Sequence, residues 1–189
     1  IKINTGGSQP SPRFGHSLEQ INKVQICLFG GATGESKKIT YTNDTYLYNI
    51  LSKVWVKLNF SENSLIPKER ASQASASNLH NQMVIHGGSS SNGALADDVL
   101  YYLTIKNNNE IQAEWKTIKT KGPTPGSRYG HTLSYISPYF VLFGGNFNPK
   151  LANDIWIINL NNNEYEWKKL NFPSDDENVP VPRIYHTSK

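Results

Sequence analysis

The sequence has little that would support a disulfide framework or a membrane span. Its one cysteine, Cys27, cannot form an intrachain disulfide, and a single thiol argues against a cysteine-based zinc site. No stretch approaches the roughly 18 consecutive apolar residues of a membrane helix, and residues 1–10 lack the basic and apolar regions of a signal peptide. We therefore expect a soluble protein of the cytoplasm, the nucleus or both, with no membrane partner.

The excess of positive charge is also small. Nineteen Lys and Arg residues against fifteen Asp and Glu residues give a net charge of +4. This is low for a nucleic-acid-binding protein, so we expect no nucleic-acid partner, whereas it is compatible with an acidic or phosphorylated protein. The chain starts at Ile1 and its only methionine is Met83, which leads us to expect a segment of a longer gene product.

Motifs of the common enzymes are missing. The sequence has no phosphate-binding loop ending in GK[ST], no GxGxxG, no GxSxG and no HExxH. It also lacks the GDxHG, GDxxDRG and GNHE clusters with which two-metal phosphatases hold their metals. We therefore expect no catalytic residue, no metal site and no cofactor within this segment.

A repeat runs through the whole chain. Each copy contains an arginine, a pair of glycines after an apolar run, an acidic residue and a tryptophan, in that order. The copies comprise Arg13, Gly30, Gly31, Asp44 and Trp55; Arg70, Gly87, Gly88, Asp98 and Trp115; and Arg128, Gly144, Gly145, Asp154 and Trp167. A fourth copy opens at Arg183. Such periodicity is typical of repeat architectures.

Within a copy, four short alternating segments separated by turn residues predict four strands. In the first copy they lie near residues 16–21, 24–29, 45–50 and 53–58, with hairpin turns at 22–23 and 51–52 and a long connection over 32–42. No segment longer than about ten residues has a helical stripe. The predicted fold class is all-β, with three four-stranded antiparallel units at about 12–58, 67–118 and 125–170 and the start of a fourth at about 180–189.

Units of this kind, with Gly-Gly after the second strand and Trp in the fourth, are similar to kelch repeats, the blades of a β-propeller. The resemblance covers residues 12–186, and the Asp boxes and Trp-Asp pairs of other propellers do not occur. Residues 1–189 would thus form a partial propeller. Three blades and part of a fourth cannot close a ring of about 4 to 8 blades. The open flanks are therefore expected to self-associate in an isolated segment.

Most of the repeated residues are expected to be structural. The glycines would permit positive φ and close approach of the next blade, and the tryptophans would pack between blades. The aspartates would accept backbone N–H groups, and the arginines would donate to carbonyls of the neighbouring blade. A ring of guanidinium groups at the blade entrances would also suit a carboxylate or phosphate.

The histidines have no metal-binding pattern. His16, His131 and His186 occupy one repeat position, where the second copy has Gln73, and this favours a scaffold role over a metal site. His86 has no evident partner in the sequence.

One face of the propeller is the candidate binding surface. Up-and-down strand order places the connections from strand two to three and from strand four to the next blade on one face, and these are longer than the hairpin turns on the other. Their basic and aromatic residues suit a protein or phosphopeptide partner, although solvated loop lysines without a binding role have the same composition. The candidate residues are Arg13, Lys37, Lys38, Tyr41, Arg70, Arg128, Phe147 and Lys150.

Several stretches narrow the resemblance further. Residues 28–33, 42–48, 115–131 and 165–171 resemble the amino-terminal propeller of serine/threonine phosphatases with kelch-like repeats. That resemblance implies a carboxy-terminal phosphatase domain outside this chain, with two divalent metals such as Mn, Fe or Zn, and a propeller that selects substrates or regulates access. The alternatives are a substrate receptor of a cullin ubiquitin ligase, with BTB and BACK segments, and a cytoskeletal or trafficking scaffold.

Overall fold

The structure, a computed structural model, describes residues 3–35, 38–107, 110–161, 164–172 and 179–188. All regular secondary structure in this part of the chain is β-strand, which confirms the predicted all-β class. Of these residues, none forms a helix with the length and apolarity needed to span a bilayer.

Twelve of the strands form three antiparallel blades in which consecutive strands pair. Blade 1 contains β3 (Ser17–Gln20), β4 (Gln25–Glu35), β5 (Lys38–Asn49) and β6 (Val54–Lys57). Blade 2 contains β7 (Ala74–Ser77), β8 (Gln82–His86), β9 (Leu100–Asn107) and β10 (Ile111–Ile118). Blade 3 contains β11 (Thr132–Ile136), β12 (Tyr139–Asn146), β13 (Leu151–Asn159) and β14 (Lys168–Leu170).

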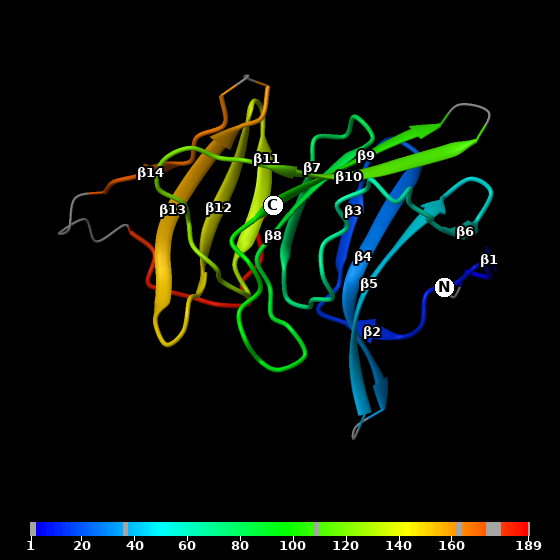
Figure 1. Ribbon diagram of the computed structural model, residues 1–189, viewed down its shortest axis with the longest axis horizontal. Coiled ribbons are helices and arrows are strands. Elements are labelled where there is room, and N and C mark those ends of the chain that lie inside the picture. The colour runs from blue at the N-terminus through cyan, green and yellow to red at the C-terminus, as the bar shows by residue number, and fades with distance from the viewer. Residues whose placement is uncertain (1–2, 36–37, 108–109, 162–163, 173–178, 189) are drawn as a thin grey trace.

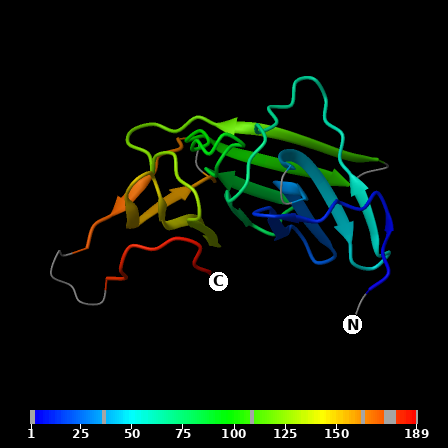
Figure 2. The same cartoon turned by 90° about the horizontal axis from the view of Figure 1, so that it is seen from below.

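The blades are arranged around a common axis. The first strands of successive blades are neighbours, because β7 contacts both β3 and β11. The three sheets fan out side by side in chain order (Figures 1 and 2). Residues 179–188 add no strand, but they return to blade 3, where the Ser188 and Ser134 hydroxyls are hydrogen-bonded. The arrangement is that of a partial propeller.

Two apolar clusters fill the joints between blades. Between blades 1 and 2, Phe29, Leu47 and Cys27 pack with residues of β8, β9 and β10. Trp115 on β10 is fully buried in this cluster. Between blades 2 and 3, Trp167, just before β14, packs in a second cluster formed by both sheets. Each of these tryptophans therefore lies against the preceding blade, whereas Trp55 is only half-buried beside the tyrosines of its own blade.

The paired glycines connect each blade to the next. The amide of the second glycine donates to the carbonyl oxygen of the arginine of the following blade, at Gly31 to Arg70, Gly88 to Arg128 and Gly145 to Arg183. All six glycines have φ between +65° and +105°. A Cβ atom on the first glycine would crowd that same carbonyl, so only glycine allows this approach.

Blade 1 has an extension that the sequence pattern did not predict. We expected residues 32–42 to be a connection, but β4 and β5 continue through a bulge at the glycines and pair as far as Glu35 and Lys38. A short strand, β2 (Arg13–Phe14), pairs with the other edge of β4. The result is a ribbon that projects beyond the sheet at the lower side of Figure 1.

The chain before blade 1 also joins this sheet. The strand β1 (Gly6–Gly7) runs parallel to β6, beside Val54 and Trp55. Blade 3 has a counterpart, because Lys121 forms a parallel bridge with Glu166, next to Trp167. The segment that leads into a blade thus covers the outer strand of that blade.

Candidate partner-binding face

The longer connections gather on one side of the molecule. The ribbon of blade 1, the loop between β8 and β9 and the loop between β12 and β13 all lie at the lower side of Figure 1. We call this side the loop face. The sharp hairpin turns of blade 1, at residues 21–24 and 50–53, lie at the other ends of the same strands.

The arginines of the repeat are used inside the blades. Arg13 donates to the Asp44 carboxylate at 2.6 Å and to the Gly30 carbonyl oxygen at 2.9 Å. Arg128 makes the same two interactions with Asp154 and Gly144, at 2.7 and 2.9 Å. The expected donation to carbonyls of the neighbouring blade is therefore wrong, because each guanidinium group bonds within its own blade.

Arg70 also bonds to a glycine carbonyl oxygen and to an aspartate of its own blade, but the aspartate is not the one expected. Its guanidinium group donates to the Gly87 carbonyl oxygen and to the Asp97 carboxylate, at 3.0 and 2.8 Å. The repeat had been aligned on Asp98, but Asp98 contacts a histidine instead. The error arose because two adjacent carboxylates fit the spacing and only the side-chain directions separate them.

Burial of these pairs leaves the arginines unavailable to a ligand. The Arg13, Arg70 and Arg128 side chains are 3%, 1% and 2% exposed. Burial alone would raise the pKa of Asp44, but the hydrogen bond and charge of Arg13 lower it overall. The Asp44 carboxylate is therefore ionised at neutral pH. A guanidinium group satisfied in this way cannot also hold a carboxylate or phosphate of a partner.

The other candidate residues differ in exposure. Lys38 and Lys150 are exposed on the loop face, and Tyr41 is half-buried on β5. Phe147 is 39% exposed, and its ring lies 5.8 Å from the Arg128 guanidinium carbon. Lys37 lies outside the described residues. The loop face therefore offers lysines and aromatic rings, with the arginines beneath them.

Four residues with positive φ surround the axis at this face. They are Gly15, Ser72, Gly130 and Tyr185, which occupy one repeat position and have φ between +56° and +64°. The Ser72 amide donates to Gly15, the Gly130 amide to Ser72 and the Tyr185 amide to Gly130. This sequence of backbone hydrogen bonds fixes the four copies of the motif relative to one another.

The next repeat position lines a hollow of about 230 Å³ at the axis. It is occupied by His16, Gln73, His131 and His186, as expected. Gln73 donates to the Phe29 carbonyl oxygen across the joint at 3.2 Å, and His186 contacts the Thr132 hydroxyl at 3.1 Å. The contacts of Gln73 and His186 cross from one blade to the next, which is a scaffold role.

His86 belongs to a buried polar network, which the sequence did not reveal. Its Nε2 lies 2.9 Å from an Asp98 carboxylate oxygen, and its Nδ1 lies 3.0 Å from Nε2 of His131. The Thr124 hydroxyl donates to the other Asp98 oxygen. A neutral His86 that donates to Asp98 accepts the His131 N–H, so the network assigns both tautomers. Burial lowers the pKa of both histidines, that of His131 most strongly.

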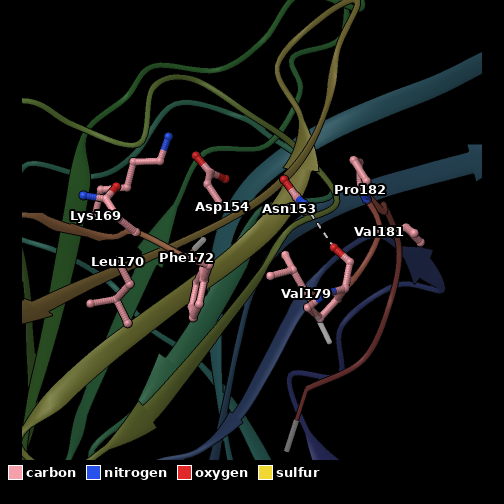
Figure 3. Close-up of a pocket in the computed structure, with 10 residues that line it drawn as sticks. Asn153, Asp154, Lys169, Leu170, Phe172, Val179, Val181 and Pro182 are labelled. Carbon is pink, nitrogen blue, oxygen red and sulfur yellow. Dashed lines mark hydrogen bonds between the residues drawn. The ribbon is translucent and has the colours of Figure 1, made fainter. Parts of the chain in front are cut away.

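A shallow pocket lies at the edge of blade 3. It has a volume of about 450 Å³ between β13, β14 and residues 179–182. Figure 3 shows Asn153, whose side chain donates to the Pro180 carbonyl oxygen at 3.1 Å, with Phe172 and Leu170 on the opposite wall. Asn43 makes the equivalent bond to Pro67 in blade 1. The pocket is thus formed by a repeated contact between strand three and the following connection.

Metal-binding chemistry is not assembled in this part of the molecule. Within the described ranges, no group of three or more His, Cys, Asp or Glu side chains is placed to hold a metal ion. Cys27 is buried, and burial raises the pKa of its thiol far above the usual value.

Comparison with known proteins agrees with this architecture. The family model for the KLHDC2/KLHL20/DRC7 kelch-repeats domain matches residues 1–188. The chain is 31% identical over 149 residues to the serine/threonine-protein phosphatase BSL2 of Arabidopsis thaliana, covering 78% of this chain and 14% of that protein. It is 36% identical over 129 residues to an F-box/kelch-repeat protein of the same plant, covering 67% of this chain and 26% of that protein.

A third relative comes from fission yeast. The tip elongation aberrant protein 1 of Schizosaccharomyces pombe is 27% identical over 187 residues, which cover 97% of this chain and 15% of that protein. The chain thus spans about a quarter or less of the length of each of these relatives. With three four-stranded blades, the glycine and arginine marks in each and a family match over residues 1–188, this chain belongs to the kelch-repeat family.

Proposed function

We propose that this kelch-repeat protein-interaction domain recognises an acidic or phosphorylated peptide on its loop face, as the recognition or regulatory region of a metal-dependent serine/threonine phosphatase. The single observation that carries the binding role is the division of charge on that face. The arginines are neutralised internally, while Lys38 on the ribbon of blade 1 and Lys150 on the loop between β12 and β13 are exposed. Exposed cations beside aromatic rings attract an anionic peptide.

The phosphatase assignment is supported by similarity rather than by a catalytic group in the chain. The relative BSL2 is named as a serine/threonine-protein phosphatase, and its matching region covers 78% of this chain. On this proposal the two divalent metals and the hydrolytic residues belong to a further domain, and the protein works in the cytoplasm or the nucleus. The propeller contributes substrate selection or control of access.

Charge reversal tests the binding role. In the longer protein, Lys38→Glu with Lys150→Glu should weaken binding of a phosphoserine peptide by about tenfold, because each change replaces attraction by repulsion. Lys23→Glu with Lys106→Glu is the matched control, since both lysines are exposed on other parts of the blades and the change in net charge is equal. Equal affinity of the two double variants, measured by fluorescence anisotropy, would refute the assignment of the loop face.

The phosphatase assignment has its own test. Manganese-dependent release of phosphate from the same peptide should persist without residues 1–189 but lose its preference among peptide sequences. If no phosphate is released with any divalent metal tested, the alternative is favoured: a substrate receptor of a cullin ubiquitin ligase or a kelch scaffold. The similarity to an F-box/kelch-repeat protein supports an adaptor of this kind.

These experiments require the longer protein because two blade faces are uncovered. Leu18 on blade 1 is 50% exposed and Ile136 on blade 3 is 62% exposed. Neither face is covered by another sheet within the described part of the chain. On this proposal, residues 1–189 in isolation self-associate through these faces.

A further inference from the structure

The ribbon of blade 1 carries backbone and side-chain features of a strand-binding site. We call residues 32–35 of β4 and 38–41 of β5 the arm. The arm continues β4 and β5 past the glycine pair and projects away from the other blades (Figure 1). Its two strands pair at every position from Ala32 with Tyr41 to Glu35 with Lys38. It is therefore a regular ribbon, joined by β2 at Ala32 and Thr33, with its other edge formed by β5.

One face of the arm is apolar and open. Phe14, Ala32 and Tyr41 lie directly opposite one another across β2, β4 and β5, so their side chains share a face, and Ile39 follows two residues from Tyr41. Phe14 is 58% exposed and Ile39 is 49% exposed. An exposed row of this kind on a projecting element is typical of an interaction surface.

The opposite face of the arm is used by the chain itself. Thr33 lies opposite Arg13 and Thr40, and its hydroxyl bonds to the Pro12 carbonyl oxygen and the Ser11 hydroxyl, both at 3.0 Å. Arg13 also donates to Ser11. The part of this face next to β2 is therefore occupied by the chain, while Thr40 and Lys38 on β5 remain exposed, so this face is polar and the apolar row lies on the other one.

The alternating direction of the backbone hydrogen bonds shows which N–H and C=O groups of β5 line its free edge. In blades 2 and 3, Ala71 with Ser89 and Tyr129 with Asn146 exchange both backbone hydrogen bonds. Ala32 holds the same repeat position opposite Phe14. Its amide and carbonyl groups therefore face β2, and those of the residue opposite it on β5, Tyr41, face away from β4.

Every second residue of β5 in the arm turns its backbone amide and carbonyl groups toward the free edge. The amide and carbonyl groups of Ile39 face the same way as those of Tyr41, while Lys38 and Thr40 bond to β4. In the described part of the chain, no hydrogen bond reaches the backbone of residues 38–41 from outside the ribbon. Ile39 and Tyr41 thus present two donors and two acceptors at strand spacing.

We propose that an extended segment of a partner protein adds to this edge as a further β-strand, pairing with Ile39 and Tyr41 and placing alternate apolar side chains over the row of Phe14, Tyr41 and Ile39. This proposal rests on the proposed binding role of the loop face and names the partner's conformation there. Backbone pairing supplies affinity and the apolar row supplies selectivity.

A peptide library displayed on phage and panned against the longer protein tests this mode. We expect some of the selected peptides to bind Ile39→Pro at least about tenfold more weakly than the wild type, because proline removes the outward N–H and blocks the edge. Ile39→Val is the matched control, since it keeps both the N–H and a β-branched side chain, and affinity should change less than about twofold.

Two readouts separate strand addition from other binding. Single N-methylation along a selected peptide should abolish binding at every second position only, because alternate amides face the arm. Amide exchange of Ile39 and Tyr41 should be fast in the free protein and slow in the complex, whereas Thr40 is protected in both. The free-protein pattern also shows whether the variants keep the ribbon.

Three outcomes would overturn the proposal: no selected peptide loses affinity for Ile39→Pro, the sensitive peptides lack the period of two, or Ile39→Pro instead removes a dimer of the protein seen in sedimentation. The last would assign the edge to a second copy of this chain. Ile39→Pro retains the lysines, so binding of the phosphoserine peptide remains measurable in it. Failure of the arm and failure of the charged loop face are thus distinguished.

Discussion

The two joints between blades achieve the same packing with different chemistry. At the joint of blades 1 and 2, the Phe29 ring meets Trp115 edge-on, with ring centres 5.1 Å apart. Beside this pair, Gln73 donates to the Ser17 hydroxyl at 3.0 Å and to the Phe29 carbonyl oxygen. At these two repeat positions the joint therefore has an apolar ring and an amide, while the Glu19 carboxyl group accepts from the Ser75 hydroxyl elsewhere in the joint.

At the joint of blades 2 and 3, histidines occupy both positions. His86 precedes the glycine pair where blade 1 has Phe29, and His131 replaces Gln73. The His86 ring still meets a tryptophan, Trp167, at 6.1 Å, but it also bonds to Asp98 and His131. The comparison shows that the blade frame accepts a pair of titratable rings at the two positions where the first joint has an apolar ring and an amide.

The first prediction concerns how tightly the two joints close. Gly30 and Gly87 both have φ of +65°, so an alanine is equally strained at either position. A Cβ at Gly87 would overlap the Arg128 carbonyl oxygen, whereas at Gly30 the Arg70 carbonyl lies 3.0 Å away. Gly87→Ala should lower the free energy of unfolding by more than about 3 kcal/mol and Gly30→Ala by about 1–2 kcal/mol.

Urea unfolding followed by tryptophan fluorescence measures both losses. Since the strain in φ is shared, the difference between the two variants reports the contact across the joint. Equal losses would show that the joints close with the same tolerance.

The second prediction concerns how the free energy of unfolding depends on pH, because only the joint of blades 2 and 3 contains the His86–His131 pair. The pKa values of His86 and His131 lie below the unfolded value of about 6.5, so the folded protein binds fewer protons than the unfolded chain between these limits. Stability should therefore rise with pH up to about 6.5 and fall as the solution is acidified, by at most about 1.4 kcal/mol per pH unit for each proton.

Transplanting the residues of the first joint is the matched control. His86→Phe with His131→Gln should reduce this pH dependence. The remainder would come from His16 and His186, whose pKa values burial also lowers, and from Glu19, whose pKa burial raises so that its contribution has the opposite sign. An unchanged slope of unfolding free energy against pH would contradict the role assigned to the network. Asp98→Asn can be added to relieve the carboxylate that loses His86.

The third prediction concerns the connection into blade 3 and has the smallest effect. Lys121 and Glu164 form an ion pair of 2.8 Å, but their side chains are 70% and 77% exposed. Water screens such a pair, so Lys121→Ala should change the free energy of unfolding by less than about 0.5 kcal/mol. A larger loss in the same urea titration would mean that the parallel bridge at Lys121 stabilises the joint through this side chain.

Much of the fold was predictable because it follows from residues that recur. The glycine pairs and tryptophans act through backbone geometry and volume, which any copy of the repeat shows. The arm is not predicted, because the sequence pattern assigns residues 32–42, after the glycine pair, to a connection. Strand pairing continues past this pair, and the alternation of Ile39, Thr40 and Tyr41 is the signal that could have predicted it.

The candidate site was less predictable because it depends on side-chain direction. Spacing placed Arg13, Arg70 and Arg128 at the blade entrances but could not show that each meets a carboxylate of its own blade. Nor could it distinguish Asp97 from Asp98, whose carboxylates diverge to Arg70 and His86. Period-two patterns locate a residue on a strand, whereas pairing between blades depends on the three-dimensional fold.

The bond from the second glycine to the next arginine has a consequence for how such proteins diversify. Each blade, counted from its arginine to its fourth strand, has its Gly31, Gly88 or Gly145 amide satisfied only by the blade that follows. A duplication or deletion of one blade therefore keeps every such bond if the segment begins and ends at equivalent positions of two repeats, whichever position that is. Copy number can therefore change by whole repeats with this backbone bond kept, although the side chains that meet at the joint then change, whereas fractional insertions leave a buried amide unpaired.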